Sequence, residues 1–195
     1  MGAMRRPQIE TAADRMAGLV RGVDDADLDR PTPCADYSVA ALLDHIDGCV
    51  VAFTAAGTKT QDPSEGPPGP GKAGNLRTDW RTAMPTGLDA LVAAWRADDA
   101  YEGTISAGGI EMPADAVAMV AIEELVVHGW DLARALGRPY DATDAELSVL
   151  DDFFGRFGPE QRGDAYGPER AVAGDASPLE HAIARSGRDP AWTTG

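Results

Sequence analysis

Three side chains in this sequence could together hold a divalent metal ion: Glu124, His128 and His45. Glu124 and His128 are four residues apart in a segment with the apolar pattern of a buried helix, and this spacing places two side chains on one helix face, about 5–6 Å apart at Cβ. Glu123 lies about 100° round that helix and is not expected to share the face. His45 lies in a second apolar helix pattern. Two imidazoles and one carboxylate, with water completing the shell, form an ordinary ligand set for a catalytic divalent metal.

Each of these residues also has a simpler interpretation. A core histidine can be hydrogen-bonded to a glutamate one turn earlier, and His45 can be satisfied by a backbone or side-chain acceptor. Spacing alone leaves these readings open. The joint arrangement favours a metal site, because two separated buried histidines and a carboxylate would otherwise need separate partners. The third histidine, His181, lies in a polar tail and is not expected to take part.

Neighbouring residues extend the hypothesis. Asp131, three residues after His128, is interpreted as an acceptor that orients the imidazole or as a weak ligand, and alternatively as a solvated charge or a partner of Arg134. Cys49 follows His45 by one turn and could be a fourth ligand, although a buried free cysteine usually only packs. Trp130 is expected to pack in the core or at an interface rather than against a cofactor.

Helices must position these residues. Apolar residues recur at three- and four-residue spacing, and they surround almost the whole circumference of the segment that carries Glu124, which predicts the central helix of a bundle. The bounds of the expected helices are about 8–23, 39–56, 79–97, 114–136 and 143–156, with a short helix near 177–186 and a short hairpin or extended crossing segment over 103–113.

The connecting segments differ in character. Residues 57–78 are rich in proline and glycine, which predicts a long flexible loop that is either an inert excursion or a lid over a substrate. Residues 158–195 form an irregular C-terminal extension. The whole chain, 1–195, is expected to be a single domain, because its length suits one core of ordinary size.

Composition narrows the function. The profile of 44% hydrophobic and 25% charged residues is that of a soluble globular protein, and no apolar run reaches the ~20 residues that span a bilayer. The net charge of −15 repels phosphate backbones, so no nucleic-acid or membrane partner is expected. Cys34 and Cys49 offer no disulfide framework, and no secretory signal is visible, which favours a cytoplasmic location. No phosphate-binding glycine loop and no nucleophile elbow of a serine hydrolase are present.

Three stretches of the sequence resemble a known family. The first covers Thr32–Val39 and continues through Leu42 to His45, the second is Glu124–Ala135, and the third comprises Asp175–Pro178 and Gly187–Trp192. Together they resemble the DinB-like bundles, and more specifically the actinobacterial single-domain proteins related to the metal-binding domain of mycothiol-dependent maleylpyruvate isomerase.

The resemblance implies a four-helix bundle that holds one divalent ion, zinc first and nickel or another ion as alternatives. The ligands would be one histidine on the second helix and a glutamate and histidine on the fourth, which correspond to His45, Glu124 and His128. Relatives use the metal to bind and activate a low-molecular-weight thiol. The isomerase itself carries a further C-terminal domain without a counterpart of similar size here, and its substrate-binding arginine has no matching position, so isomerisation of maleylpyruvate is not expected.

The leading hypothesis is therefore a metal-dependent thiol S-transferase or isomerase, with mycothiol a candidate cosubstrate and a small electrophile as substrate. Its catalytic residues stay unassigned. The alternatives are a non-catalytic, stress-related metal-binding module and a hydrolase that uses metal-bound water. The sequence leaves the substrate, the metal and the oligomeric state open, a homodimer included.

Overall fold

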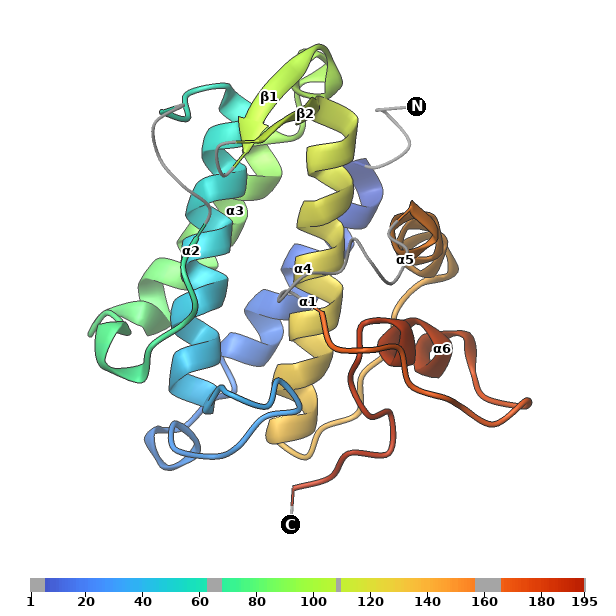
Figure 1. Cartoon of the computed structure of the whole chain (residues 1–195). Helices are drawn as coiled ribbons and strands as arrows, with labels where there is room; N and C mark the ends of the chain where they lie inside the picture. Colours follow the sequence, from blue (N-terminus) through green and yellow to red (C-terminus); the bar gives the residue numbers. More distant parts are fainter. Residues whose placement is uncertain (1–5, 63–67, 108–109, 157–165, 195) are drawn as a thin grey trace.

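Helices make up most of the structure, which is a computed structural model describing residues 6–62, 68–107, 110–156 and 166–194. The described part contains six α-helices and one pair of short strands (Figure 1). In chain order these are α1 (Arg6–Val20), α2 (Val39–Thr58), α3 (Trp80–Ala94), β1 (Thr104–Ala107), β2 (Ile110–Pro113), α4 (Ala114–Ala135), α5 (Asp144–Arg156) and α6 (Pro178–Arg185).

The first four helices form a bundle in which α1 and α2 each pack against both α3 and α4. The next helix, α5, packs on the outer side of α4, and α6 packs on α5 (Figure 1). The predicted all-α, four-helix bundle is confirmed. All the predicted helices are present, and their ends differ from the expected ones by no more than a few residues, where fraying and capping blur the boundary.

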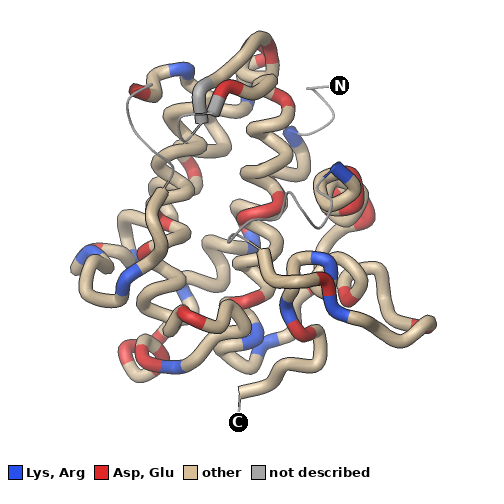
Figure 2. Tube along the Cα trace, in the orientation of Figure 1, with Lys and Arg blue, Asp and Glu red and all other residues tan. Residues whose placement is uncertain are grey.

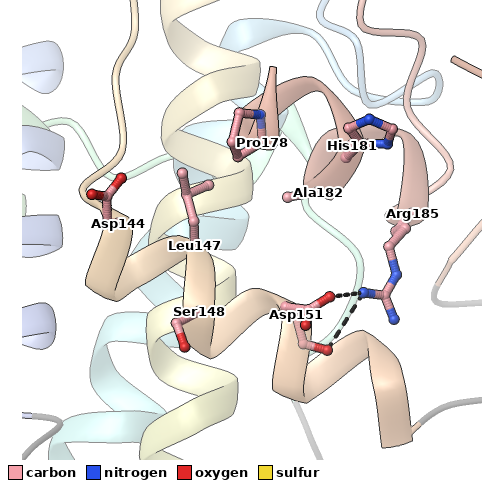
Figure 3. A pocket seen from close by; sticks show the side chains of 8 residues that line it. All are labelled: Asp144, Leu147, Ser148, Asp151, Pro178, His181, Ala182 and Arg185. Carbon is pink, nitrogen blue, oxygen red and sulfur yellow. Dashed lines mark hydrogen bonds and ion pairs between the residues drawn. The ribbon is translucent and has the colours of Figure 1, made fainter. Parts of the chain in front are cut away.

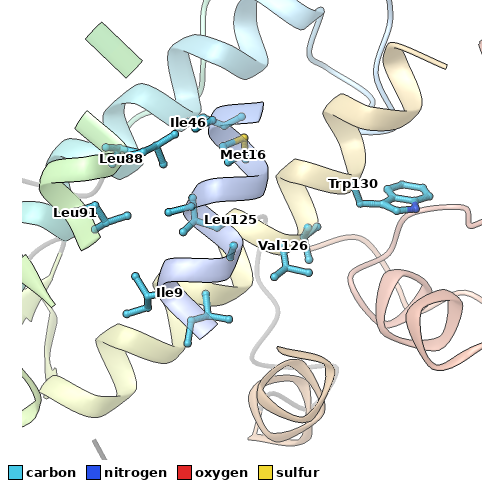
Figure 4. Packing of buried hydrophobic residues seen from close by; sticks show 14 of the residues in the cluster. Ile9, Met16, Ile46, Leu88, Leu91, Leu125, Val126 and Trp130 are labelled. Carbon is cyan, nitrogen blue, oxygen red and sulfur yellow. The ribbon is translucent and has the colours of Figure 1, made fainter. Parts of the chain in front are cut away.

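The central helix of the bundle is α4, as its all-round apolar pattern predicts. It is buried over most of its length, and it shares the core with side chains from α1, α2 and α3 (Figure 4). Trp130 is 3% exposed and packs in this core, which confirms its predicted role. The core therefore encloses the helix that carries Glu124 and His128.

The second helix of the bundle carries His45. It begins at the Ser38 side chain, which accepts a hydrogen bond from the Ala41 amide and so satisfies one of the free amides of the first turn. Of the described helices, α2 is the one that is long and apolar enough to cross a membrane. Half of its residues are buried in the bundle, which is the behaviour of a core helix.

The segment between α3 and α4 is the predicted hairpin. Strands β1 and β2 pair antiparallel, with Thr104 opposite Pro113. The predicted Gly108-Gly109 connection lies outside the described residues. At the other predicted loop, 57–78, α2 extends as far as Thr58, residues 63–67 lie outside the description, and residues 73–75 form a 3-10 turn.

In the described part of the C-terminal extension, residues 166–194, the predicted short helix is present as α6, and no strand or further α-helix accompanies it. A capping box holds the start of α6, since Ser177 and Glu180 exchange side-chain and backbone hydrogen bonds. Basic and acidic residues are interspersed over the described trace, with no basic stripe (Figure 2). The prediction against nucleic-acid partners stays a prediction.

Candidate metal centre

The interface between α2 and α4 brings together the three residues that the sequence singles out. One carboxylate oxygen, Oε2 of Glu124, lies 3.2 Å from Nε2 of His128 and 3.5 Å from Nε2 of His45. The two imidazole rings meet edge to face, with centroids 4.9 Å apart. The three side chains are 9–22% exposed, so the cluster lies just beneath the surface.

Behind His128, a buried ion pair fixes the ring. The Nδ1 atom of His128 is 2.9 Å from Oδ2 of Asp131, whose side chain is fully buried. Arg188, from the C-terminal extension, donates to both oxygens of the same carboxylate, at 3.0 and 3.4 Å. Asp131 is therefore an orienting acceptor, and its cationic partner is Arg188. Arg134, the partner weighed from sequence, instead packs over the Trp130 ring and donates to a backbone carbonyl.

Behind His45, a backbone carbonyl lies beside Nδ1, as the Asp131 carboxylate does behind His128. The Nδ1 atom of His45 is 3.4 Å from the carbonyl oxygen of Gly69. A carbonyl oxygen only accepts, so a proton on Nδ1 would satisfy this contact and leave the lone pair of Nε2 for a metal. Both imidazoles thus turn Nδ1 outward to an acceptor and Nε2 inward toward Glu124.

Three electron-pair donors facing one another require a cation between them. Without a metal the cation is a proton, and burial alone would lower the pKa of His128, but Asp131 and Glu124 raise it to about 9. Burial alone would raise the pKa of Glu124, whereas the neighbouring His128 and then His45 hold it well below its usual range. The site is thus built to keep a carboxylate charged and to bind a positive charge.

The distances also suit a metal ion. Zinc bonds of about 2.0–2.2 Å to nitrogen and oxygen in a tetrahedron separate the ligand atoms by about 3.3–3.5 Å. The two separations from Glu124, 3.2 and 3.5 Å, fall close to this range. Each histidine also has the outer acceptor that metal-binding histidines almost always have. Among the described residues, however, the set whose ligand atoms all lie within 4.8 Å of one another is His45, Cys49 and Glu124, so a divalent ion fits Glu124 and His45 as they stand, with Cys49 or His128 as the third ligand.

Cys49 belongs to the same cluster. Among the described residues, candidate ligand atoms of His45, Cys49 and Glu124 all lie within 4.8 Å of one another. The Cys49 sulfur is 3.5 Å from Nε2 of His45 and 3.9 Å from Oε2 of Glu124. Burial, followed by the Glu124 charge, raises the pKa of this thiol well above its ordinary value. Cys49 and Cys34 are both free thiols, as predicted.

Two charged groups at the site were not anticipated from sequence. Glu123 is 2% exposed and accepts a hydrogen bond from the Tyr166 hydroxyl at 2.8 Å. Burial and the neighbouring Glu124 charge raise the pKa of Glu123 well above its usual range. Arg188, the other group, is in the Gly187–Trp192 stretch that carries the family resemblance, and this was the one available signal for it.

The free space beside the cluster is a narrow slot between α2, α3 and α4. Its volume is about 10 Å³, close to that of one water molecule. Glu124, His128 and Cys49 border it, and its accessible lining is apolar, with Ile46, Val50, Phe53, Leu91 and Leu125 as the other residues. The cluster thus faces an environment that favours an apolar group over water.

A larger groove of about 330 Å³ lies elsewhere, between α5 and α6 (Figure 3). Asp144 and His181 line it and are exposed, and Arg185 there is ion-paired with Asp151. It lacks the buried, converging polar atoms of the α2–α4 cluster. The chemistry of the molecule is therefore concentrated at the smaller site.

Comparison with known proteins gives a family match over most of the chain. Residues 9–133 match the family described as "Mycothiol maleylpyruvate isomerase N-terminal domain". Two curated relatives from Mycobacterium tuberculosis are "Uncharacterized protein MT0763" (strain CDC 1551 / Oshkosh) and "Uncharacterized protein Rv0738" (strain ATCC 25618 / H37Rv). Each is 27% identical over 194 residues, which cover 92% of this chain and 94% of the relative.

Solved structures support the fold. The crystal structure of the mycothiol-dependent maleylpyruvate isomerase superposes with a TM-score of 0.62 at 16% identity, covering 79% of this chain and 69% of that one. A histidine-to-alanine mutant of that enzyme gives the same values. At this identity the likeness concerns the arrangement of the helices. The matched residues 9–133 include His45, Glu124 and His128, whereas Arg188 lies beyond them.

Proposed function

Because the chain belongs to the mycothiol maleylpyruvate isomerase N-terminal domain family, we propose that it is a divalent-metal protein that acts with a low-molecular-weight thiol of the mycothiol kind. The reaction would be transfer of the thiol to a small electrophile, or isomerisation of that electrophile. One observation carries the proposal: Oε2 of Glu124 lies 3.2 Å from Nε2 of His128 and 3.5 Å from Nε2 of His45. Each imidazole also has an acceptor beside its Nδ1 atom.

His45, Glu124 and His128 would hold the ion, with zinc the first choice for two nitrogens and one oxygen. When bound, such an ion lowers the pKa of a thiol or water that ligates it and so supplies a nucleophile at neutral pH. The chain's own contribution is to keep Glu124 ionised and to hold both imidazoles in the orientation that presents Nε2.

The side chains next to the cluster are apolar. Ile46, Val50, Phe53, Leu91 and Leu125 line the adjoining slot of about 10 Å³, and these walls would exclude water that competes with the thiol, while a substrate would enter only if they moved apart. Arg188 is committed to Asp131, so it is not free to bind a substrate carboxylate. A dicarboxylate such as maleylpyruvate is therefore not proposed as the substrate.

A specific observation favours a second candidate function. The Cys49 sulfur lies 3.5 Å from Nε2 of His45, a separation compatible with a fourth ligand on the same ion. Four protein ligands would close the coordination shell, as in structural zinc sites, and the protein would then be a non-catalytic metal-binding module.

Zinc binding by purified variants tests the ligand assignment. We expect one zinc ion per chain in the wild type and loss of binding in His45→Ala, Glu124→Gln and His128→Ala. His181→Ala is the matched control, because this exposed histidine lies in the α5–α6 groove. Retention of stoichiometric zinc by His128→Ala would refute the assignment.

Cys49→Ser separates the two functions. If the thiol only packs, the variant keeps the zinc affinity of the wild type, and a cellular thiol such as mycothiol raises the melting temperature of the zinc-loaded protein. If Cys49 completes the shell, the variant loses affinity and the wild type shows no response to thiols. The second pattern would overturn the transferase or isomerase proposal in favour of the closed site.

A further inference from the structure

We propose that residues 68–72, the described end of the proline- and glycine-rich loop, are a positioning element for His45. The segment would hold the imidazole of His45 in its metal-binding orientation through the carbonyl of Gly69. This inference rests on the proposed function, since it gives the loop a role in the same metal site. It differs from both sequence-based interpretations of the loop, an inert excursion and a lid, because the segment contacts a side chain of the site directly.

The contact to His45 is made by the backbone. The Gly69 carbonyl oxygen lies 3.4 Å from Nδ1 of His45, while Nε2 of the same ring lies 3.5 Å from Glu124. A ring held at one nitrogen by an acceptor presents the other nitrogen in a defined direction. Any displacement of Gly69 would therefore free the ring to rotate away from Glu124.

Gly71 lets the segment approach α2 closely enough for this contact. A Cβ atom at Gly71 would lie 2.0 Å from the Ala41 carbonyl oxygen and 2.9 Å from Cβ of His45. The Ala41 carbonyl belongs to the backbone of the helix and cannot move aside cheaply. Only glycine fits here, and the close approach is directly against the helical turn that carries His45.

Two further hydrogen bonds anchor the segment at the same place. The Gly71 amide donates to the Tyr37 hydroxyl at 3.0 Å, and the Lys72 amide donates to the Asp44 carboxylate at 2.9 Å. The Tyr37 ring also lies against His45, with centroids 5.6 Å apart. Both anchors thus fall next to His45 in sequence or in space, which concentrates the binding of the loop on one ligand.

A pair of glycine-to-alanine substitutions in the same loop tests the proposal. Gly71→Ala should weaken zinc binding by about 10- to 100-fold, the usual effect of losing the outer partner of a metal ligand. Gly74→Ala is the matched control, because a Cβ there meets no atom within 4 Å and the residue lies outside residues 68–72. It should bind zinc as the wild type does.

Imidazole NMR signals give a second measurement that a general loss of stability would not reproduce. The chain has three histidines, so each signal can be assigned by substitution. In metal-free protein, Gly71→Ala should shift the His45 signals and leave those of His181 in place. Equal zinc affinity in Gly71→Ala and Gly74→Ala, or unshifted His45 signals, would overturn the inference.

Tyr37→Phe keeps the test decisive if Gly71→Ala does not fold. It preserves the ring beside His45 and removes only the hydroxyl that accepts from Gly71. We expect Tyr37→Phe to weaken zinc binding and to shift the His45 NMR signals, both to a smaller extent than Gly71→Ala does. If neither change is seen, the proposal is wrong. If the wild type binds no zinc, the proposed function fails, and the histidine spectra still decide whether residues 68–72 orient His45.

Discussion

Replacing Arg188 with glutamine should destabilise the metal-free protein strongly. Arg188 donates two hydrogen bonds to Asp131, which is fully buried and also holds His128. The guanidinium is 10% exposed, so water does little to replace it when it is removed. The substitution therefore leaves a buried carboxylate without its cation, the most costly way to break an ion pair.

The magnitude follows from this burial. Breaking a buried pair by removing one partner costs about 3–5 kcal/mol. For a chain of 150–250 residues, each kcal/mol shifts the melting temperature by about 2–4 °C, so a fall of about 6–20 °C is expected. Arg185→Gln is the control, because its pair with Asp151 is 24% and 80% exposed and such surface pairs contribute about 0–1 kcal/mol.

The two variants should also differ in acid. Burial alone would raise the pKa of Asp131, but Arg188 and then His128 hold it below its ordinary value. A lowered carboxylate pKa contributes stability above the unfolded-state value of about 3.9, and this stability is lost as the pH falls toward the folded-state pKa. Without Arg188 the folded-state pKa rises, so stability should begin to fall at a higher pH than in the wild type.

Urea unfolding followed by circular dichroism, at pH 7 and in steps down to pH 4 with a chelator present, measures both effects. We expect Arg188→Gln to lose several times more free energy of unfolding than Arg185→Gln at pH 7. If the two variants agree within about 1 kcal/mol, the accepted cost of a surface pair, the argument that Arg188 is the buried partner of Asp131 is wrong.

Three further predictions concern the site and the core. Glu123→Gln should stabilise the protein most above pH 7. The folded-state pKa of Glu123 is raised, so this carboxyl reduces the stability of the protein as the pH rises from its unfolded-state pKa through its folded-state pKa. Denaturant unfolding at pH 5 and pH 8 measures the gain, and an equal gain at both pH values, or none at pH 8, would contradict this reasoning. In metal-free protein, protonated His128 should contribute its full stability below pH 6.5, and this contribution should be lost as the pH rises through about 9. Zinc binding near pH 7 should therefore release protons, and calorimetry in buffers of different ionisation enthalpy measures that release. A binding heat that is the same in every buffer would contradict the prediction. Leu88→Ala, at a core position with 1% exposure (Figure 4), should cost about 2–5 kcal/mol, and a loss below 1 kcal/mol in urea unfolding would argue against tight packing there.

Much of the fold could be predicted because helices are specified locally. Apolar periodicity placed the four bundle helices, and in the structure the Ser38 and Ser177 side chains cap the starts of α2 and α6. The helix ends were less certain, as at Thr58, where α2 continues into the predicted loop. Termini depend on a few local bonds that periodicity does not report.

For the candidate site, the sequence selected His45, Glu124 and His128, and the structure brings these side chains together. That choice was possible because all three lie in apolar helix patterns, where an ionisable side chain needs a partner, and because the motifs around them resemble those of a metal-binding family. The sequence did not indicate how Glu123 is accommodated, since a hydrogen bond from Tyr166 crosses 43 residues. Metal binding itself stays a prediction.

The helices and the inward-facing positions of His45, Glu124 and His128 could thus be read from patterns within one or two helical turns, whereas the burial of Glu123 could not. The tertiary structure decided what each of these residues contacts. Asp131 meets Arg188 across 57 residues, and His45 meets Gly69 across 24. Hydrophobic periodicity indicates that a side chain faces inward. Which residue it contacts there depends on how the helices and the C-terminal extension pack, and this packing is a property of the whole chain.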